Sequence, residues 1–254
     1  MTMHRQAVQE EEQMMFRNKF GALVAAAAAL AWCATAARAY EGGAVANGGT
    51  ISGEVKLQGA APAPKPVEVT KDNEVCGQHE IKTEDLLVGA SGGIENAVVS
   101  ITNITKGKPM GPADATLDQK GCQYLPHVLL FPAGTTVKIN NDDGILHNIH
   151  TYSQKNAPIN MAQPKFKKTI EAKFDQPEVI KVTCDAHGWM NGWFVAEDNP
   201  YYVKTDANGS FKLTDVPAGD YEVKAWQEKL GEKTQKVTVP AGGEAKASFE
   251  FVPK

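Results

Sequence analysis

The chain has 254 residues, of which 42% are hydrophobic and 7% aromatic, as expected for a globular protein of one or two domains. Its formal net charge of −4 comes from 26 basic and 30 acidic residues that are scattered along the chain. Nucleic-acid binding needs a concentrated basic face, whereas the longest basic run here is Lys167–Lys168, so the sequence argues against that class of partner.

Residues 1–39 have the pattern of an export signal. Basic residues precede an alanine-rich apolar stretch from Gly21 to Trp32, and Ala37–Ala39 is a small-x-small cleavage motif. We expect cleavage before Tyr40 and a protein that acts in the periplasm without stable membrane insertion. An uncleaved membrane anchor and a lipoprotein modified at Cys33 are the alternatives.

After this segment the sequence is typical of an all-β protein. Short alternating or β-branched runs are separated by turns rich in Gly, Pro, Asn and Asp, and helical periodicity is nearly absent. The expected strands are Thr50–Leu57, Ala97–Asn103, His127–Phe131, Thr135–Asn140, His147–Tyr152, Phe166–Ala172, Glu178–Thr183, Gly192–Ala196, Ser210–Leu213, Gly219–Trp226, Thr234–Val239 and Ala245–Phe251.

The C-terminal motifs "TDANGSFKLTDVPAGDYEVKAW" and "TQKVTVPAGGEAKASFEF" resemble the second half of a carboxypeptidase-regulatory-like domain, which is a small transthyretin-like β-sandwich. The earlier motifs "GTISGEVKLQG" and "IENAVVSITN" resemble its first half. We therefore expect one sandwich built from residues 40–112 and 200–254, with another domain inserted at residues 113–199. Two separate β-domains in tandem are the alternative.

A potential metal-binding motif runs from Cys184 to Met190, with a thiol, an imidazole and a thioether in the order Cys-x2-His-x2-Met. His147 fits as a further ligand from an upstream strand, whereas His150 would face the opposite side of that strand. Two imidazoles and a thiolate, with a weak thioether, suit both Cu(I) and Cu(II). Zinc prefers four strong ligands, so the motif predicts one copper ion.

The same loop resembles that of the cupredoxins, the blue-copper proteins, in a short form similar to amicyanin rather than the longer form of plastocyanin. Upstream, "VLLFPAGTTVKINNDDGILHNIH" resembles the strand pair that leads to the first histidine of that family. The resemblance implies a Greek-key sandwich over residues 113–199, in which Asn148 helps to fix the copper loop and the ring edge of His187 is the exposed exit for an electron. It implies one type 1 copper ion with the ligands His147, Cys184, His187 and Met190.

Two cysteines remain outside the signal and the metal motif, Cys76 and Cys122, and they allow one disulfide. Export to an oxidising compartment favours this bridge. A second metal site formed with His79 and His127, or two free thiols, are the alternatives.

These features predict a periplasmic carrier of single electrons, not an enzyme, with partners such as c-type cytochromes or a copper-handling protein. A copper-delivery or storage protein with the same ligands is the alternative, but it would be favoured by a Met-rich or His-rich tail that the chain lacks. A multicopper oxidase or nitrite reductase relative would need further cupredoxin domains and His-x-His clusters. A binding or structural role of the other sandwich is the remaining possibility.

Overall fold

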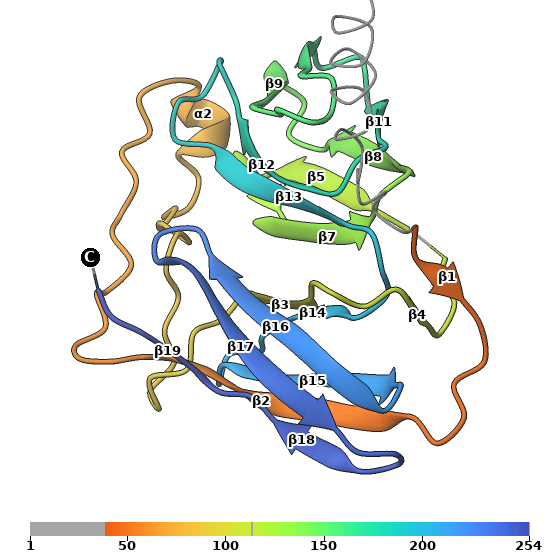
Figure 1. Cartoon of the computed structure of the whole chain (residues 1–254). Helices are drawn as coiled ribbons and strands as arrows, with labels where there is room; N and C mark the ends of the chain where they lie inside the picture. The colour runs from red at the N-terminus through yellow and green to blue at the C-terminus, as the bar shows by residue number, and fades with distance from the viewer. Residues whose placement is uncertain (1–38, 113, 254) are drawn as a thin grey trace, which may run out of the picture. The chain divides into compact units, whose positions relative to one another are not determined.

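The computed structural model describes residues 39–112 and 114–253 (Figure 1). The predicted export signal, apart from Ala39, and Cys33 lie outside the described residues. The helix and strands, in chain order, are β1 (Glu41–Gly42), β2 (Gly49–Leu57), α2 (Asn73–Cys76), β3 (Val98–Ile101), β4 (Lys106–Gly107), β5 (Thr116–Lys120), β6 (Gln123–Leu125), β7 (Val128–Pro132), β8 (Thr135–Asn141), β9 (His147–Thr151), β10 (Asn160–Gln163), β11 (Thr169–Phe174), β12 (Glu178–Thr183), β13 (Asn191–Glu197), β14 (Tyr202–Lys204), β15 (Ser210–Val216), β16 (Gly219–Gln227), β17 (Gly231–Val239), β18 (Glu244–Lys246) and β19 (Phe249–Phe251).

The first sandwich consists of strands β5 to β13. One sheet has the order β10-β9-β12-β13-β7 and the other has the order β11-β8-β5-β6. Strand β7 pairs in parallel with β13, and β5 pairs in parallel with β8, while the other pairs are antiparallel. Parallel neighbours cannot be joined by tight hairpins, so the chain crosses between the sheets.

Alternation along the strands builds the core of the first sandwich. In β8 every second side chain from Thr135 to Asn141 is buried, because successive side chains of a strand point to opposite faces. Val137 and Ile139 of this sheet belong to the same apolar cluster as Ile180 and Phe194 of the other sheet. This shared core holds the two sheets face to face.

The second sandwich is assembled from segments that lie on both sides of the first in the sequence (Figure 1). One sheet has the order β14-β3-β16-β17, and the other has the order β15-β2-β18, with β19 also paired to β2. Strands β2 and β3 precede the first sandwich, whereas β14 to β19 follow it. Ile51, Val99, Val223 and Phe251 are among the buried residues of its core.

The segment of residues 66–82 departs from the predicted organisation. The sequence assigns residues 40–112 to the second sandwich, yet Val67, Cys76 and Ile81 pack in the core of the first sandwich. Apolar packing holds this segment there, and the disulfide between Cys76 and Cys122 ties it to the loop between β5 and β6.

Aromatic and polar side chains make contacts between the two sandwiches. The indole rings of Trp193 and Trp226 contact each other edge to face, with centroids 5.1 Å apart. The Glu228 carboxylate accepts a hydrogen bond from Trp193 Nε1 at 2.7 Å and also pairs with Nε2 of His127. His127 is therefore a buried residue of this interface and not a metal ligand partnered with Cys122.

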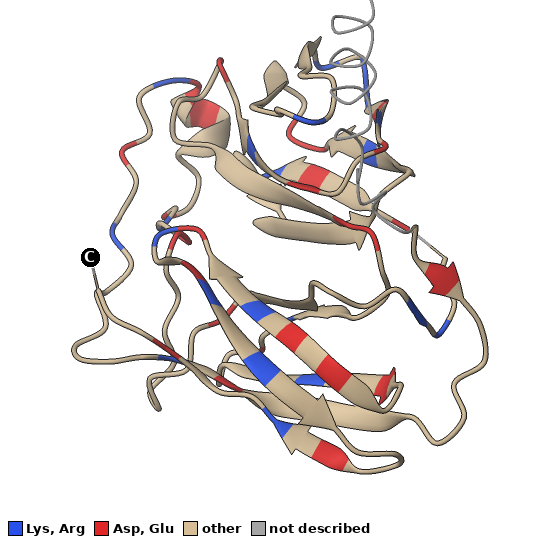
Figure 2. Ribbon diagram, in the orientation of Figure 1, with Lys and Arg blue, Asp and Glu red and all other residues tan. Residues whose placement is uncertain are grey.

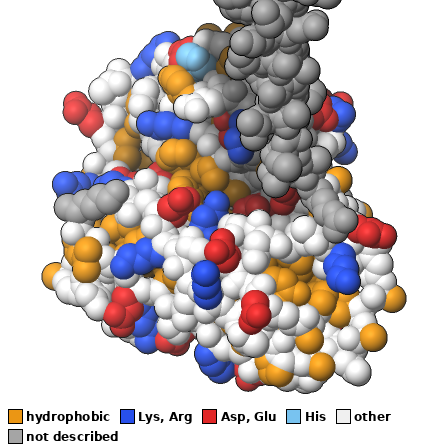
Figure 3. Space-filling model, in the orientation of Figure 1, with side chains coloured by type: hydrophobic (Ala, Val, Ile, Leu, Met, Phe, Trp, Pro, Cys, Tyr) orange, Lys and Arg blue, Asp and Glu red, His pale blue; other side chains and the backbone are white. Residues whose placement is uncertain are grey.

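The predicted strands correspond closely to observed strands, but several short ones were not predicted. The clearest omission is β5 (TLDQK), whose charged and polar residues hide the alternation. The described residues contain no helix long and apolar enough to cross a membrane. Figure 2 shows charges of both signs interspersed along the strands, and the face in Figure 3 has hydrophobic groups separated by such charges.

Candidate metal centre

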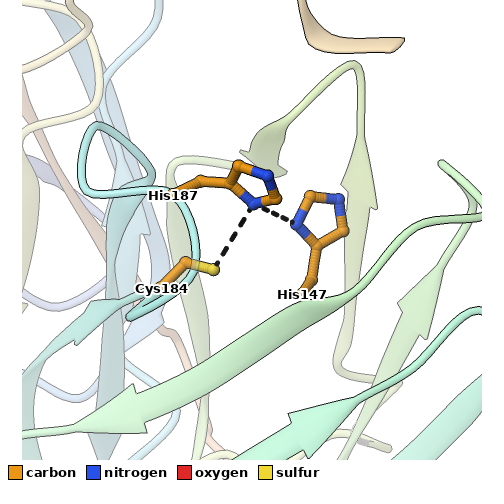
Figure 4. Close-up of side chains that lie close together, drawn as sticks. All are labelled: His147, Cys184 and His187. Atoms are coloured by element: carbon orange, nitrogen blue, oxygen red, sulfur yellow. Dashed lines mark hydrogen bonds between the residues drawn. The ribbon is translucent and has the colours of Figure 1, made fainter. Parts of the chain in front are cut away.

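Three potential ligands converge within the first sandwich. Nδ1 of His147 lies 3.1 Å from Nδ1 of His187, and the same His187 atom lies 3.8 Å from Sγ of Cys184 (Figure 4). All donor atoms lie within 4.8 Å of one another. Both imidazoles are 0% exposed and the thiol is 2% exposed, so the cluster is sealed from solvent.

The strand pairing explains why these residues meet. His147 begins β9, and Cys184 directly follows the end of β12. Because β9 and β12 are antiparallel, the start of one lies beside the chain that leaves the other. Residues 184–190 form the connection between β12 and β13, which pair up to Thr183 and Asn191.

Backbone hydrogen bonds close this connection into a tight loop. The Met190 N–H donates to the His187 carbonyl at 2.9 Å, and the Cys184 N–H donates to the Met190 carbonyl at 3.2 Å. Met190 is 2% exposed and shares the apolar cluster that contains Cys184. Met190 is therefore buried at the end of this loop. It follows His147, Cys184 and His187 in the chain.

Asn148 connects the histidine strand to the loop. Its Oδ1 accepts a hydrogen bond from the Asp185 N–H at 3.0 Å, and its Nδ2 donates to Asn160. Since Asp185 directly follows Cys184, this contact fixes the chain that carries the thiol.

A carboxylate lies behind each imidazole, and the sequence analysis missed both. Nε2 of His147 lies 2.8 Å from Oδ2 of Asp143, and Nε2 of His187 lies 2.8 Å from Oδ2 of Asp72. Such contacts hold an N–H at Nε2 of each ring and turn Nδ1 toward the other potential ligands, as in the carboxylate–histidine pairs of metal sites. Asp143 lies 4 positions before His147, so its contact with that histidine could have been suspected from the sequence.

The surroundings shift the pKa values of these groups. Burial raises the pKa of the Cys184 thiol, but the hydrogen bond with His147 and backbone N–H groups outweigh it, so the pKa is lowered overall. Burial lowers the pKa of His147, yet hydrogen bonds with Asp143 and Cys184 raise it overall. For His187, burial and the nearby His147 lower the pKa despite Asp72. A thiol with a lowered pKa more readily supplies the thiolate that a soft metal ion needs.

The expectation that His187 offers an exposed ring edge is wrong. Its ring is fully buried because Asp72, from residues 66–82, covers Nε2, and the Trp189 ring lies with its centroid 5.0 Å away. Trp189 is itself held by a hydrogen bond from Nε1 to the Cys122 carbonyl at 3.1 Å. His150 stays outside the cluster, paired with Asp185 and stacked on Tyr152.

The donor set fits a copper ion. The two Nδ1 atoms and the thiol sulfur lie close enough to one another to share one ion. Two imidazoles and one thiolate are the planar set that serves both oxidation states of copper. His147, His187 and Cys184 would hold the ion, and the buried Met190 is the residue available as a weaker thioether ligand.

The predicted bridge between Cys76 and Cys122 is present, with Cα atoms 5.3 Å apart and a sequence separation of 46. Cys184 is a free, buried thiol. Sγ of Cys122 lies close to Asp143 and His147, so the bridge is directly beside the candidate metal centre.

Comparisons with known proteins found one family model and several solved structures that are similar to parts of the chain. Residues 195–252 match the carboxypeptidase regulatory-like domain family. Curated proteins gave no significant match. Among solved structures, the chain is similar to a purple cupredoxin from Nitrosopumilus maritimus, with 27% identity, 33% of this chain and 100% of that chain covered, and a TM-score of 0.29.

Two further solved structures are similar over about the same share of the chain. Amicyanin from Paracoccus versutus has 22% identity, with 39% of this chain and 97% of that chain covered, at a TM-score of 0.30. A Cu-containing nitrite reductase from Thermus scotoductus has 23% identity and a TM-score of 0.31, with 35% of this chain but 24% of that chain covered. This protein is an all-β chain of two sandwiches, and residues 195–252, which include most of the C-terminal strands of the second, match the carboxypeptidase regulatory-like domain family.

Proposed function

We propose that this protein is a periplasmic carrier of single electrons that holds one type 1 copper ion. His147, Cys184 and His187 would hold the ion, and Met190 would supply a weak thioether ligand. The convergence of both Nδ1 atoms and the thiol sulfur in a sealed cluster is the observation that supports this proposal most strongly. When bound, copper supplies a centre that accepts and releases one electron.

The protein matrix suits this task better than catalysis. Asp143 and Asp72 hold the two imidazoles from behind, and the backbone hydrogen bonds of residues 184–190 hold the thiol, so the ligand set is rigid. A rigid set favours electron exchange because little rearrangement accompanies the change in copper charge. Burial of every ligand leaves a substrate no route to the ion, so we propose a carrier and not an enzyme.

The partners in this proposal are periplasmic redox proteins such as c-type cytochromes. A carrier of this kind docks weakly and transiently, with a small interface on each partner. Copper delivery is less well supported, since exchange of copper with a partner requires access to a ligand, and both imidazoles are fully buried.

The visible absorption spectrum, recorded after loading with Cu(II) and again after ascorbate, tests the proposal. We expect an intense thiolate-to-copper band that bleaches with ascorbate and returns on reoxidation, and no such band with Zn(II). A colourless protein that binds Cu(I) stoichiometrically would instead indicate copper delivery. A protein that binds no copper would overturn both.

A further inference from the structure

Residues 66–82, here named the Asp72 loop, form a closed loop on the first sandwich. The ends of the loop meet, because the Val67 N–H donates to the Ile81 carbonyl at 2.9 Å and Pro66 pairs with Lys82. Val67 and Ile81 are packed in the core of that sandwich. The loop is therefore anchored at its base by packing and hydrogen bonds and farther along by the disulfide of Cys76.

Asp72 adopts an unusual conformation to reach His187. Its backbone is left-handed, with φ 51° and ψ 44°, a conformation that costs a non-glycine residue about 1–2 kcal/mol. It occupies the N-cap position of α2, yet its side chain makes no capping hydrogen bond there. The carboxylate instead lies 2.8 Å from Nε2 of His187. The carboxylate therefore contacts the imidazole of His187 and not the end of the helix.

One disulfide positions both carboxylates behind the imidazoles. Cys76 ends the short helix that Asp72 begins. Its partner Cys122 donates its backbone N–H at 2.8 Å to Asp143, which holds His147. Gly121 donates a second backbone N–H to the same carboxylate at 2.6 Å. Movement at the bridge would therefore disturb the outer hydrogen bonds of both histidines.

We propose that the Asp72 loop is a built-in cap on the copper centre, in which Asp72 is a positioning residue for His187 and the disulfide between Cys76 and Cys122 holds the cap closed. The cap withholds the ring edge of His187 from solvent and from partner proteins. Its carboxylate also favours the more highly charged Cu(II), which lowers the reduction potential. The part of this inference that concerns copper rests on the proposed function, whereas the covering of His187 does not.

The covering of His187 can be tested on the copper-free protein by acylation with diethyl pyrocarbonate, followed by site-resolved mass spectrometry. Asp72→Gly suits the left-handed backbone and removes the carboxylate, so His187 should be modified severalfold faster than in the unaltered protein. Asp72→Asn keeps an oxygen that can accept the ring N–H and should retain slow modification. The exposed Glu74→Gln on the same loop is the matched control, and the exposed His79 is the internal reference.

Replacement of both Cys76 and Cys122 by Ser tests the role of the bridge. With Asp72 unaltered, His187 should still become more reactive, because the loop is no longer held down. An unchanged rate in a folded double variant would overturn the role of the bridge. An unchanged rate in Asp72→Gly, which leaves the bridge intact, would overturn the cap itself.

The reduction potential of the copper-loaded protein tests the effect of the charge. Both Asp72→Asn and Asp72→Gly should shift the potential upward, while Glu74→Gln leaves it unchanged because an exposed charge is screened. Copper affinity should fall about 10- to 100-fold in Asp72→Gly. A blue protein with an unchanged potential in Asp72→Asn would overturn the charge effect and leave the carrier function standing. If neither the unaltered protein nor any variant binds copper, the proposed function fails. The acylation rates of the copper-free proteins still test the cap.

Discussion

Nδ1 of His147 and Nδ1 of His187 lie 3.1 Å apart, although the two residues are separated by 40 positions in the chain. Each ring is oriented by a carboxylate on its far nitrogen, so both Nδ1 atoms face the same point beside the Cys184 sulfur. This arrangement of donors makes specific predictions about individual residues of the centre and its surroundings.

The two histidines of β9 should behave differently on substitution. His147→Ala removes a donor of the cluster and should abolish the thiolate-to-copper band. His150→Ala, three positions along the same strand, should leave the band intact because His150 pairs with Asp185 outside the cluster. Absorption after Cu(II) loading measures both. If His150→Ala loses the band and His147→Ala retains it, the ligand on this strand is His150 and not His147.

Met190→Gln should retain copper and lower its reduction potential, because a harder oxygen donor favours Cu(II) more than a thioether does. Met161→Gln, a change at another methionine packed against the same core, should not shift the potential. Copper content and potentiometry on the two variants provide the measurement. Complete loss of copper from a folded Met190→Gln variant would make Met190 a principal ligand instead of a weak axial one.

The disulfide predicts both a thiol count and a stability change. A protein that begins at Tyr40, denatured without reductant and metal, should show one reactive thiol, that of Cys184. Replacing Cys76 and Cys122 by Ser should lower the free energy of unfolding by about 2–4 kcal/mol, mainly because the unfolded chain gains freedom. Urea unfolding gives this difference. A count of three thiols would mean that the bridge does not form.

His127 predicts a pH-dependent contribution to stability at the interface of the sandwiches. Burial lowers its pKa, but Glu228, with Glu84 and Asp85, raises it overall above the ordinary 6.5. The folded state therefore binds this proton more tightly than the unfolded state. The stabilisation is fully present below about pH 6.5 and is lost as the pH rises through the folded pKa.

His127→Gln should thus cost about 1–3 kcal/mol at pH 6 and less at pH 9. Urea unfolding of the copper-free variant and of the unaltered protein at both pH values gives the difference, in which the titration of other groups cancels. His79→Gln, at an exposed histidine, is the matched control. An equal cost at both pH values would show that protonation of His127 contributes nothing.

The all-β fold could be predicted because the strands are short alternating runs bounded by turns, and those patterns are local. The proximity of His147 and Cys184 could be predicted because the Cys-x2-His-x2-Met motif needs a further histidine ligand from an upstream strand. His147 begins such a strand. Strand β5 was missed because Gln119, a polar residue, occupies a buried position where the alternation would have an apolar one. The segment that carries Cys76 was misplaced because nothing in its own sequence shows which core it joins.

The carboxylate behind His187 could not have been found from the sequence. Asp72 lies 115 positions from His187, in a polar segment without regular periodicity. The segment reaches His187 through the apolar packing of Val67 and Ile81 together with the disulfide of Cys76, and these are contacts between parts of the chain far apart in sequence. The expectation of an exposed His187 failed for the same reason, since the covering loop comes from outside the 113–199 range that the copper motif suggested.

The most direct test of the central claim is a spectroelectrochemical titration of the copper-loaded protein, with copper content measured in both states. We predict that the thiolate band follows a reversible one-electron curve, with one copper per chain before and after reduction, and that Cys184→Ser shows no band. Copper that leaves on reduction, or a band that survives in Cys184→Ser, would contradict an electron carrier built on His147, Cys184 and His187.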